Sequence, residues 1–443
     1  MKLKKATGLT LAALMTVSLI PGTALAAEDY SLKDVQFDNV TIRVATRNGG
    51  GAESAVDAYY LSKVEEFNAM DNGITVEMIN ISTEADYLDR LSTDFASGDA
   101  PNIFLEYGGS RVLDYLEADY LLDLQPYLEA DPDWYGGFKE NGWSTCKFED
   151  YGYEGIYGVP SETYQIMLFY NKSLLEENGI EVPATWDELM DACAKLKEAG
   201  VQPFVVGEKD AFRFGHLHTV LSLKKYGADV AQKLASREMS YDGEEMLSIY
   251  GMIKTMVDNG YLGDNLLSTD KGQEDTYFEE GKAAFKYDGS WYPAQIEESG
   301  SELFANQEVG VVRFPSIEAK YEKTDMGGTT DAYYISTLNA TEEQVQASVV
   351  FLKYLASVDY IEGLIAVNPN TYAYNVDVKT DNYLLNDVMA IMNDTEDVRS
   401  DLQGYDTQSM AMNTVRTALQ GLAMGKTPEE VGSEIVDSLA EYE

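Results

Sequence analysis

The chain shows a strand, loop, helix, strand pattern near its beginning. Residues 40–44 alternate apolar and polar side chains, which is the period of a strand with one buried face. A polar, glycine-rich segment follows at 47–53, and apolar side chains then recur on one helical face over 56–67, which predicts a helix. A second alternating run at 74–78 completes a βαβ unit, and such units place their strands parallel in one sheet.

The next segments extend this α/β pattern. Apolar side chains recur at helical spacing over 88–95, a Gly-Asp-Ala-Pro turn ends that helix, and 103–105 have the composition of a short buried strand. We therefore predict that the chain begins with an α/β lobe whose sheet is largely parallel. Ligands bind outside the carboxyl ends of the strands in such sheets, so the loop 47–53 and the turn 106–111 are candidate binding segments.

Capping boxes mark the first residues of three later helices. In this motif a threonine hydroxyl and a Glu or Gln three residues later cap each other's backbone N–H groups. The pairs are Thr185 with Glu188, Thr341 with Gln344, and Thr427 with Glu430. We predict ordinary amphipathic core helices that begin at these residues.

Residues 1–26 have the pattern of a secretory signal peptide. Three lysines precede an apolar run at 9–20, and the segment ends in Ala24-Leu25-Ala26, an A-x-A cleavage pattern. The apolar run is shorter than the roughly 20 residues that a membrane-spanning helix needs. We therefore expect export and cleavage after Ala26.

The composition excludes one class of function. The 443 residues contain 32 Lys and Arg against 76 Asp and Glu, a net charge of −44 that becomes −47 without the three lysines of 1–26. Nucleic-acid binding is not expected, because phosphate backbones need dense Lys and Arg. The chain is 45% hydrophobic and 11% aromatic, which is enough for a core, and its length suggests two or three domains.

Catalytic and metal-binding patterns are weak. His216 and His218 are the only histidines, and a pair of histidines without a placed carboxylate is a weak zinc signal. The sequence has neither the nucleophile pattern G-x-S-x-G nor a phosphate-binding P-loop, and we expect no cofactor. Cys193 lies on an apolar helical face, as a core thiol does, whereas Cys146 lies in a loop rich in Gly and aromatic residues. Whether the two cysteines form a disulfide is left open.

The aromatic residues are more informative. The chain has 31 tyrosines, and several aromatic residues occupy turns or strand ends instead of helical faces. The apolar faces of sugar rings stack on aromatic rings while their hydroxyls pair with polar side chains, so this distribution favours an uncharged carbohydrate ligand. Pairs of carboxylates are not evidence for a glycosidase active site here, because 76 acidic residues guarantee many such pairs.

Five segments, in the expected order, resemble family 1 extracellular solute-binding proteins of ABC transporters, the relatives of maltose-binding protein. The longest is YNKSLLEENGIEVPATWDEL at 170–189. The others are FASGDAPNIF at 95–104, FEEGKAAFKYDGSWYPAQI at 278–296, VGVVRFP at 309–315 and VRTALQGLAMGKTPEEV at 415–431. The similarity spans nearly the whole chain after residue 26.

The resemblance implies an α/β fold of the type II periplasmic-binding-protein kind, in which two lobes with mixed sheets and flanking helices enclose a ligand cleft at a hinge. It divides the chain into a first lobe of 36–118 plus 327–370 and a second lobe of 119–326 plus 371–443. Each lobe is discontinuous in sequence, so we expect several chain crossings between the lobes.

Ten residues are ligand-binding candidates by this resemblance. Trp291, with Asp288 beside it, matches the stacking tryptophan of the family. The other second-lobe candidates match ligand-contacting segments of the family, and they are Tyr164, Phe212 and Arg213. The first-lobe candidates come from the polar loop, from the turn after the third strand and from the stretch that re-enters this lobe, and they are Asn48, Glu53, Glu106, Tyr107 and Asp331.

The function that the resemblance implies is capture without catalysis. A monomer would bind a sugar or oligosaccharide between its lobes and deliver it to the transmembrane subunits of an ABC permease. Two rival classes remain, a secreted carbohydrate-active hydrolase and a binder of a peptide, amino acid or metal. Gram-positive members usually carry a lipid-anchoring Cys after the signal, but Ala26-Ala27-Glu28 has none, so the periplasm and the extracellular cell surface are both open.

Overall fold

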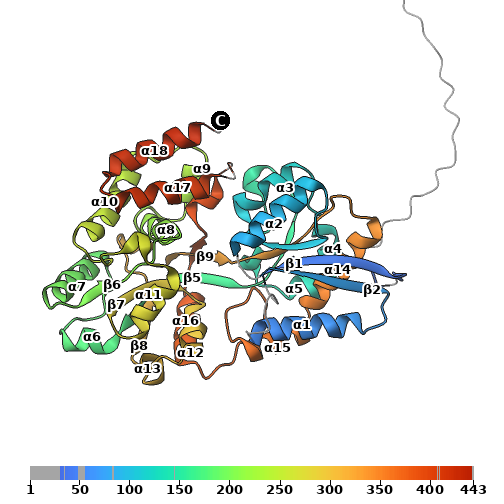
Figure 1. The fold of residues 1–443 in the computed structure, drawn as a ribbon, viewed down its shortest axis with the longest axis horizontal. Helices are drawn as coiled ribbons and strands as arrows, with labels where there is room; N and C mark the ends of the chain where they lie inside the picture. Colours follow the sequence, from blue (N-terminus) through green and yellow to red (C-terminus); the bar gives the residue numbers. More distant parts are fainter. Residues whose placement is uncertain are drawn as a thin grey trace, which may run out of the picture.

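The computed structural model describes residues 30–33, 35–47, 55–81, 84–143, 145–406, 408 and 410–441. These residues form two α/β lobes that lie side by side (Figure 1). The predicted signal peptide 1–26 lies outside them, as does the predicted binding loop apart from residue 47. Within the described ranges, each helix is too short or too polar to span a lipid bilayer.

The first lobe is built around a five-stranded mixed sheet of order β2-β1-β3-β10-β4. Its strands are β1 (Val40–Thr46), β2 (Ile74–Asn80), β3 (Ile103–Glu106), β4 (Gly158–Pro160) and β10 (Ala332–Ile335). Strand β1 is parallel to β2 and β3, which confirms the predicted βαβ unit, whereas β10 is antiparallel to β3 and β4. The alternation in β1 buries Val40, Ile42 and Val44 and leaves Thr41 exposed, as predicted.

The helices of the first lobe cover the faces of this sheet (Figure 1). The predicted apolar face of α1 is confirmed, because Tyr60, Val64 and Phe67 are buried in it. The helices are α1 (Ala55–Asn68), α2 (Glu84–Ser97), α3 (Leu113–Glu117), α4 (Gln125–Ala130), α5 (Pro132–Gly136), α14 (Glu342–Leu355) and α15 (Val358–Val367), with short 3-10 turns η1 (Gly109–Val112), η2 (Glu140–Trp143) and η3 (Glu149–Tyr151).

The second lobe has a six-stranded sheet of order β11-β9-β5-β7-β6, in which β8 also pairs with β5. The strands are β5 (Thr163–Asn171), β6 (Gln202–Phe204), β7 (Ala283–Gly289), β8 (Val309–Arg313), β9 (Thr324–Thr329) and β11 (Asp397–Arg399). Successive residues of β5 point to opposite faces, so Ile166 and Leu168 join one apolar core while Met167 and Phe169 join another. Both faces of this sheet are therefore buried.

Helices cover both of these faces, and the predicted capping boxes of α7, α14 and α18 are all present. The helices of the second lobe are α6 (Lys172–Glu177), α7 (Trp186–Glu198), α8 (Arg213–Tyr226), α9 (Val230–Ala235), α10 (Glu244–Asp258), α11 (Lys271–Glu279), α12 (Tyr292–Glu298), α13 (Glu302–Ala305), α16 (Tyr383–Asn393), α17 (Ala411–Leu419) and α18 (Pro428–Ala440). Short 3-10 turns are η4 (Leu266–Ser268), η5 (Ala319–Tyr321), η6 (Leu402–Tyr405) and η7 (Gln420–Leu422).

Within the described ranges, the chain crosses between the lobes three times. Residues 161–162 connect β4 of the first sheet to β5 of the second, and residues 330–331 return the chain from β9 to β10. The third crossing lies within 375–382, between Tyr374 in the first core and Leu384 in the second lobe. Several adjacent crossings of this kind are suited to act as a hinge.

The packing corrects the predicted lobe boundaries at 118 and 370. Residues 121–159 belong to the first core, together with Tyr372 and Tyr374. The reason is that β4 pairs with β10, and Phe138 forms a bridge with Tyr374. The change in composition at residue 119 therefore marks an aromatic-rich part of the first lobe, and the chain leaves this lobe only after β4.

The two cysteines lie in different cores. Cys146 is buried in the first core and Cys193 in the second, and both are free thiols. Burial raises the pKa of Cys146 to about 12, which keeps its thiol protonated. The question of a disulfide, left open by the sequence, is answered against one.

Candidate functional site

Two aromatic residues lie together on the second lobe near the crossing segments. Tyr164 belongs to β5, and Trp291 follows β7, which is the antiparallel neighbour of β5. Their ring centroids are 5.8 Å apart with an interplanar angle of 35°. Both side chains are partly exposed. The pair therefore provides an aromatic surface that a ligand can reach.

A polar group lies beside this aromatic pair. Arg416 of α17 donates from Nη2 to Asp401 Oδ2 at 2.6 Å, and His216 Nε2 lies 3.9 Å from the same oxygen. The ring of Phe212 meets His216 edge-on, with centroids 5.3 Å apart. The charges of Asp401 and Arg416 act on the Tyr164 hydroxyl, so this hydroxyl lies close to the polar group.

Three buried polar atoms in this region have no hydrogen-bond partner among the described residues: Glu208 Oε1, His216 Nδ1 and Arg416 Nε. The other Glu208 oxygen accepts the backbone N–H of Phe214 at 2.8 Å, so the carboxyl group is held in place. Buried polar atoms usually find partners, and leaving one without a partner costs about 1–3 kcal/mol. Several such atoms close together are a typical property of a site that a polar ligand completes.

The protonation of this group suits an uncharged ligand. Burial raises the pKa of Glu208 to about 8, against the opposing effects of the Phe214 N–H, Arg213 and Arg416. Burial also lowers the pKa of His216 to about 4, with Asp401 opposing and Arg416 assisting. At neutral pH the carboxyl group is largely protonated and the imidazole is neutral, so both can exchange hydrogen bonds with hydroxyl groups.

The first lobe contributes a second polar group at the carboxyl end of its sheet. Arg47, directly after β1, donates from Nη2 to Asp331 Oδ2 at 2.6 Å, and Asp331 lies in the crossing segment 330–331. The Arg47 guanidinium also lies over the Tyr107 ring, 4.3 Å from its centroid. Glu106 is buried at the end of β3, where its carboxylate accepts the Tyr107 backbone N–H at 2.9 Å.

The crossing segments bring a further acid to this place. Glu162 accepts a hydrogen bond from Asn370 Nδ2 at 3.0 Å. Burial, with the nearby charge of Asp331 adding to it, raises the pKa of Glu162 to about 8. Glu162 thus lies close to Asp331 of the first-lobe group, at the crossing segments.

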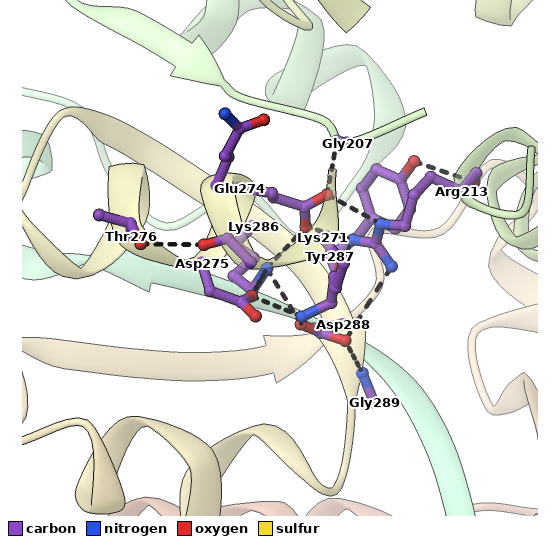
Figure 2. A network of polar contacts seen from close by, with 12 residues as sticks. Gly207, Arg213, Lys271, Glu274, Asp275, Thr276, Lys286, Tyr287, Asp288 and Gly289 are labelled. Atoms are coloured by element: carbon purple, nitrogen blue, oxygen red, sulfur yellow. Dashed lines mark hydrogen bonds and ion pairs between the residues drawn. The ribbon is translucent and has the colours of Figure 1, made fainter. Parts of the chain in front are cut away.

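A cluster of charged residues surrounds Asp288 (Figure 2), which accepts a hydrogen bond from Trp291 Nε1 at 3.1 Å. Carboxylate oxygens of Glu274, Asp275 and Asp288 lie within 4.8 Å of one another, an arrangement that could hold a metal ion. Lys286 Nζ already contacts all three, at 2.6, 2.7 and 3.0 Å. The ammonium group therefore takes the position that a cation would need, and we assign no metal to these carboxylates.

The predicted site residues separate into three groups. Asn48 and Glu53 lie outside the described residues. The structure groups most of the others in the two sets above, namely Glu106, Tyr107 and Asp331 in the first lobe and Tyr164, Phe212 and Trp291 in the second. Arg213 and Asp288 are fully buried behind Trp291, which argues against the predicted direct contact of either with a ligand.

Sequence reasoning missed Arg47, Glu208, His216, Asp401 and Arg416. Arg47 had a local signal, because it opens the polar loop directly after a strand. His216 was noted only as half of a weak zinc pair. Asp401 and Arg416 are brought together only by the packing of η6 against α17, so no local pattern could have identified them.

Two comparisons of the amino-acid sequence identify relatives. The sequence profile of the bacterial extracellular solute-binding protein family matches residues 51–362. A binding protein of Brucella abortus is 25% identical over 345 residues, which are 75% of this chain and 80% of that protein. A diacetylchitobiose-binding protein of Streptomyces coelicolor is 28% identical over 227 residues, 49% of this chain and 45% of its own.

The fold is also similar to solved structures. A chitin oligosaccharide-binding protein superposes with a TM-score of 0.77 at 21% sequence identity, covering 91% of this chain and 98% of that chain. Structural similarity at this level of sequence identity is evidence about the fold alone. It confirms the predicted arrangement of two lobes with mixed sheets and flanking helices.

Proposed function

The chain belongs to the bacterial extracellular solute-binding protein family, and we propose that it captures an uncharged sugar or oligosaccharide between its lobes. Members of this family bind solutes and are not enzymes. The observation that carries the proposal is the aromatic surface of Tyr164 and Trp291 beside buried polar atoms that have no partner among the residues the structure describes. Aromatic rings match the apolar faces of a sugar, and the polar atoms match its hydroxyls.

The charges of the site support an uncharged ligand. Arg47 is paired with Asp331, and Arg416 is paired with Asp401, so neither arginine presents an uncompensated charge. The protein as a whole is strongly acidic, and its field disfavours an anionic ligand. A zwitterionic amino acid would need charged partners for both of its ends, and the neutral Glu208 and His216 do not supply them.

The two lobes would close on the ligand. A ligand that contacts groups of both lobes binds the closed arrangement better than an open one, and this difference shifts the population toward closure. In the described structure the lobes already touch, because the Tyr151 hydroxyl of the first lobe donates to the Gly404 carbonyl of the second at 2.5 Å. We place the ligand between the Arg47 group and the Trp291 group.

The ligands of two similar proteins suggest the first ligands to test. One binds diacetylchitobiose and the other binds chitin oligosaccharides. We propose isothermal titration of the full exported chain with chitobiose, chitotriose, xylo-oligosaccharides and raffinose, and with an amino-acid mixture as the non-sugar arm. Saturable binding of at least one glycan is expected, and binding confined to the amino acids would overturn the proposal.

Variants at Trp291 test the position of the site. Trp291→Ala removes the stacking surface, and we expect affinity to fall about thirtyfold or more, as for a central aromatic contact. Trp291→Phe keeps an aromatic ring and should retain most of the affinity. The same mixtures are analysed for new reducing ends, because glycan cleavage by the purified protein would show a hydrolase instead of a capture protein.

Export, delivery and oligomeric state are further parts of the proposal. We propose cleavage after Ala26, release to the periplasm or the extracellular surface, and delivery to the transmembrane subunits of an ABC permease by a monomer. N-terminal sequencing of the exported protein should begin at Ala27. Light scattering should give the mass of one chain with and without ligand, and the glycan-loaded protein should stimulate ATP hydrolysis by the reconstituted permease.

A further inference from the structure

The charged cluster around Asp288 consists of three basic and three acidic side chains from three elements (Figure 2). Helix α11 contributes Lys271, Glu274 and Asp275, strand β7 contributes Lys286 and Asp288, and α8 contributes Arg213. Four of the six are at most 1% exposed, namely Arg213, Glu274, Lys286 and Asp288. The formal charges of the six sum to zero, so the cluster can be buried without an external counter-ion.

Burial of this kind does not by itself indicate a gain in stability. Removing charges from water is unfavourable, and an apolar cluster of similar volume would often be at least as stable. The cluster therefore needs another explanation. The residue to examine is Asp288, because it accepts a hydrogen bond from the Trp291 side chain.

Asp288 is held as an anion at a fixed position. Burial alone would raise its pKa, but Lys271, Lys286 and Arg213 outweigh burial and hold the pKa of Asp288 far below its usual range. Lys271 Nζ and Lys286 Nζ contact Asp288 Oδ2 at 2.9 and 3.0 Å. Arg213 Nη1 lies 4.0 Å from Oδ1, beyond hydrogen-bond distance, so Oδ1 accepts its hydrogen bonds from outside the cluster.

Asp288 Oδ1 accepts two hydrogen bonds that fix Trp291. The Gly289 backbone N–H donates to it at 2.9 Å, and the Trp291 Nε1–H donates to it at 3.1 Å. The indole also lies directly against Gly289, because a Cβ atom there would be 2.4 Å from two carbons of the ring. The Tyr164 ring is a further neighbour of the indole. The edge and one face of the indole are thus both in contact with protein groups.

We propose that the charged cluster, acting through Asp288, sets the orientation of the Trp291 indole in advance of ligand binding. Hydrogen bonds to an ionised acceptor are stronger than neutral ones, and the rigid anion leaves the indole one favourable orientation. A ligand then binds without ordering the ring, which is the advantage of a preorganised site. Asp288 is a positioning residue in this scheme. The effect on affinity rests on the proposed function, whereas the orientation of the ring does not.

The first measurement needs no ligand. The chain has four tryptophans, so tryptophan labelled with nitrogen-15 gives four indole N–H signals, and Trp291→Phe identifies the one from Trp291. Asp288→Asn replaces the ionised acceptor with a neutral one of the same shape. We expect the Trp291 indole signal to move upfield in the proton dimension and its exchange with water to accelerate about tenfold or more, while the other three signals stay in place.

Two further variants keep the test decisive. If Asp288→Asn does not fold, Lys271→Met removes only one partly exposed contact of Asp288 and should shift the same signal by a smaller amount. Asp94→Asn is the matched control, because Asp94 is a buried aspartate of the first lobe that pairs with Arg90. This control should leave the Trp291 signal unchanged.

The affinity for a glycan found by titration completes the test. Asp288→Asn should weaken binding about tenfold, with a larger loss of binding entropy, whereas Asp94→Asn should not change it. An unmoved Trp291 signal in a folded Asp288→Asn protein would overturn the positioning role. If the signal moves but no glycan binds to the wild-type protein, the positioning role stands and the proposed function fails.

Discussion

The two lobes present their candidate binding groups on different supports. In the first lobe Arg47 and Asp331 form one ion pair near the surface, with side chains 14% and 19% exposed. In the second lobe Trp291 donates a hydrogen bond to Asp288. Asp288 belongs to a charged cluster whose central residues are at most 1% exposed. Buried polar atoms of Glu208 and His216 in the second lobe also have no hydrogen-bond partner within the part of the chain that the structure describes. The second lobe thus holds its candidate binding groups on a buried support, while the first lobe holds Arg47 and Asp331 in a partly exposed ion pair.

The largest effect should come from removing one buried charge of the second lobe. Arg213→Met leaves Glu274 and Asp288 without the guanidinium that balances them, and we expect the free energy of unfolding to fall by about 3–5 kcal/mol. Arg47→Met removes the same chemical group from the first lobe and should lower the free energy of unfolding by about 1 kcal/mol. Urea unfolding followed by circular dichroism measures both. Equal losses would show that the two supports do not differ.

A pH effect should distinguish the second-lobe face. Folding raises the pKa of Glu208 to about 8. A carboxyl of this kind stabilises the fold fully below its unfolded pKa, near 4, and loses that contribution as the pH rises through about 8. Between pH 6 and 8 the wild-type protein should lose about 2 kcal/mol of stability from this group.

The variant Glu208→Gln isolates this contribution. Glutamine has the shape of the protonated acid but does not titrate, so the fall in unfolding free energy from pH 6 to pH 8 should be about 2 kcal/mol smaller than in the wild-type protein. Parallel urea titrations at the two pH values measure the difference. The same fall in both proteins would mean that Glu208 is ionised in the folded state at pH 6.

The smallest expected loss of stability comes from removing a helix N-cap, and it should be the same in both lobes. Thr341 caps α14 of the first lobe, and Thr427 caps α18 of the second, each with a complete capping box. Replacing either threonine with Ala removes a side-chain acceptor for a backbone N–H and should destabilise the protein by about 1 kcal/mol. Thermal unfolding of the two variants should agree closely. A clear difference would show that the second lobe is simply more sensitive to any substitution.

Several local elements of this protein can be predicted from its sequence. The alternation at 40–44 predicts β1, the helical spacing over 56–67 predicts α1, and the three capping boxes predict the first residues of α7, α14 and α18. Each of these patterns acts over a few residues, through strand or helix periodicity or through a hydrogen bond to a backbone group three positions away. The motif around Trp291 was recognisable for the same reason, because Asp288, Gly289 and Trp291 are close in sequence.

Tertiary structure alone decided which charges meet and where each lobe ends. Arg47 and Asp331 are separated by 284 positions, and Arg213 and Glu274 by 61, so no periodic pattern connects them. The sequence could not show that Arg213 lies inside the protein, since a charged side chain is expected outside until its partner is known. Likewise, residues 121–159 belong to the first lobe because β4 pairs with a strand more than 170 positions later. Such pairings depend on how the whole chain packs, and the polar side of the candidate site is made of them.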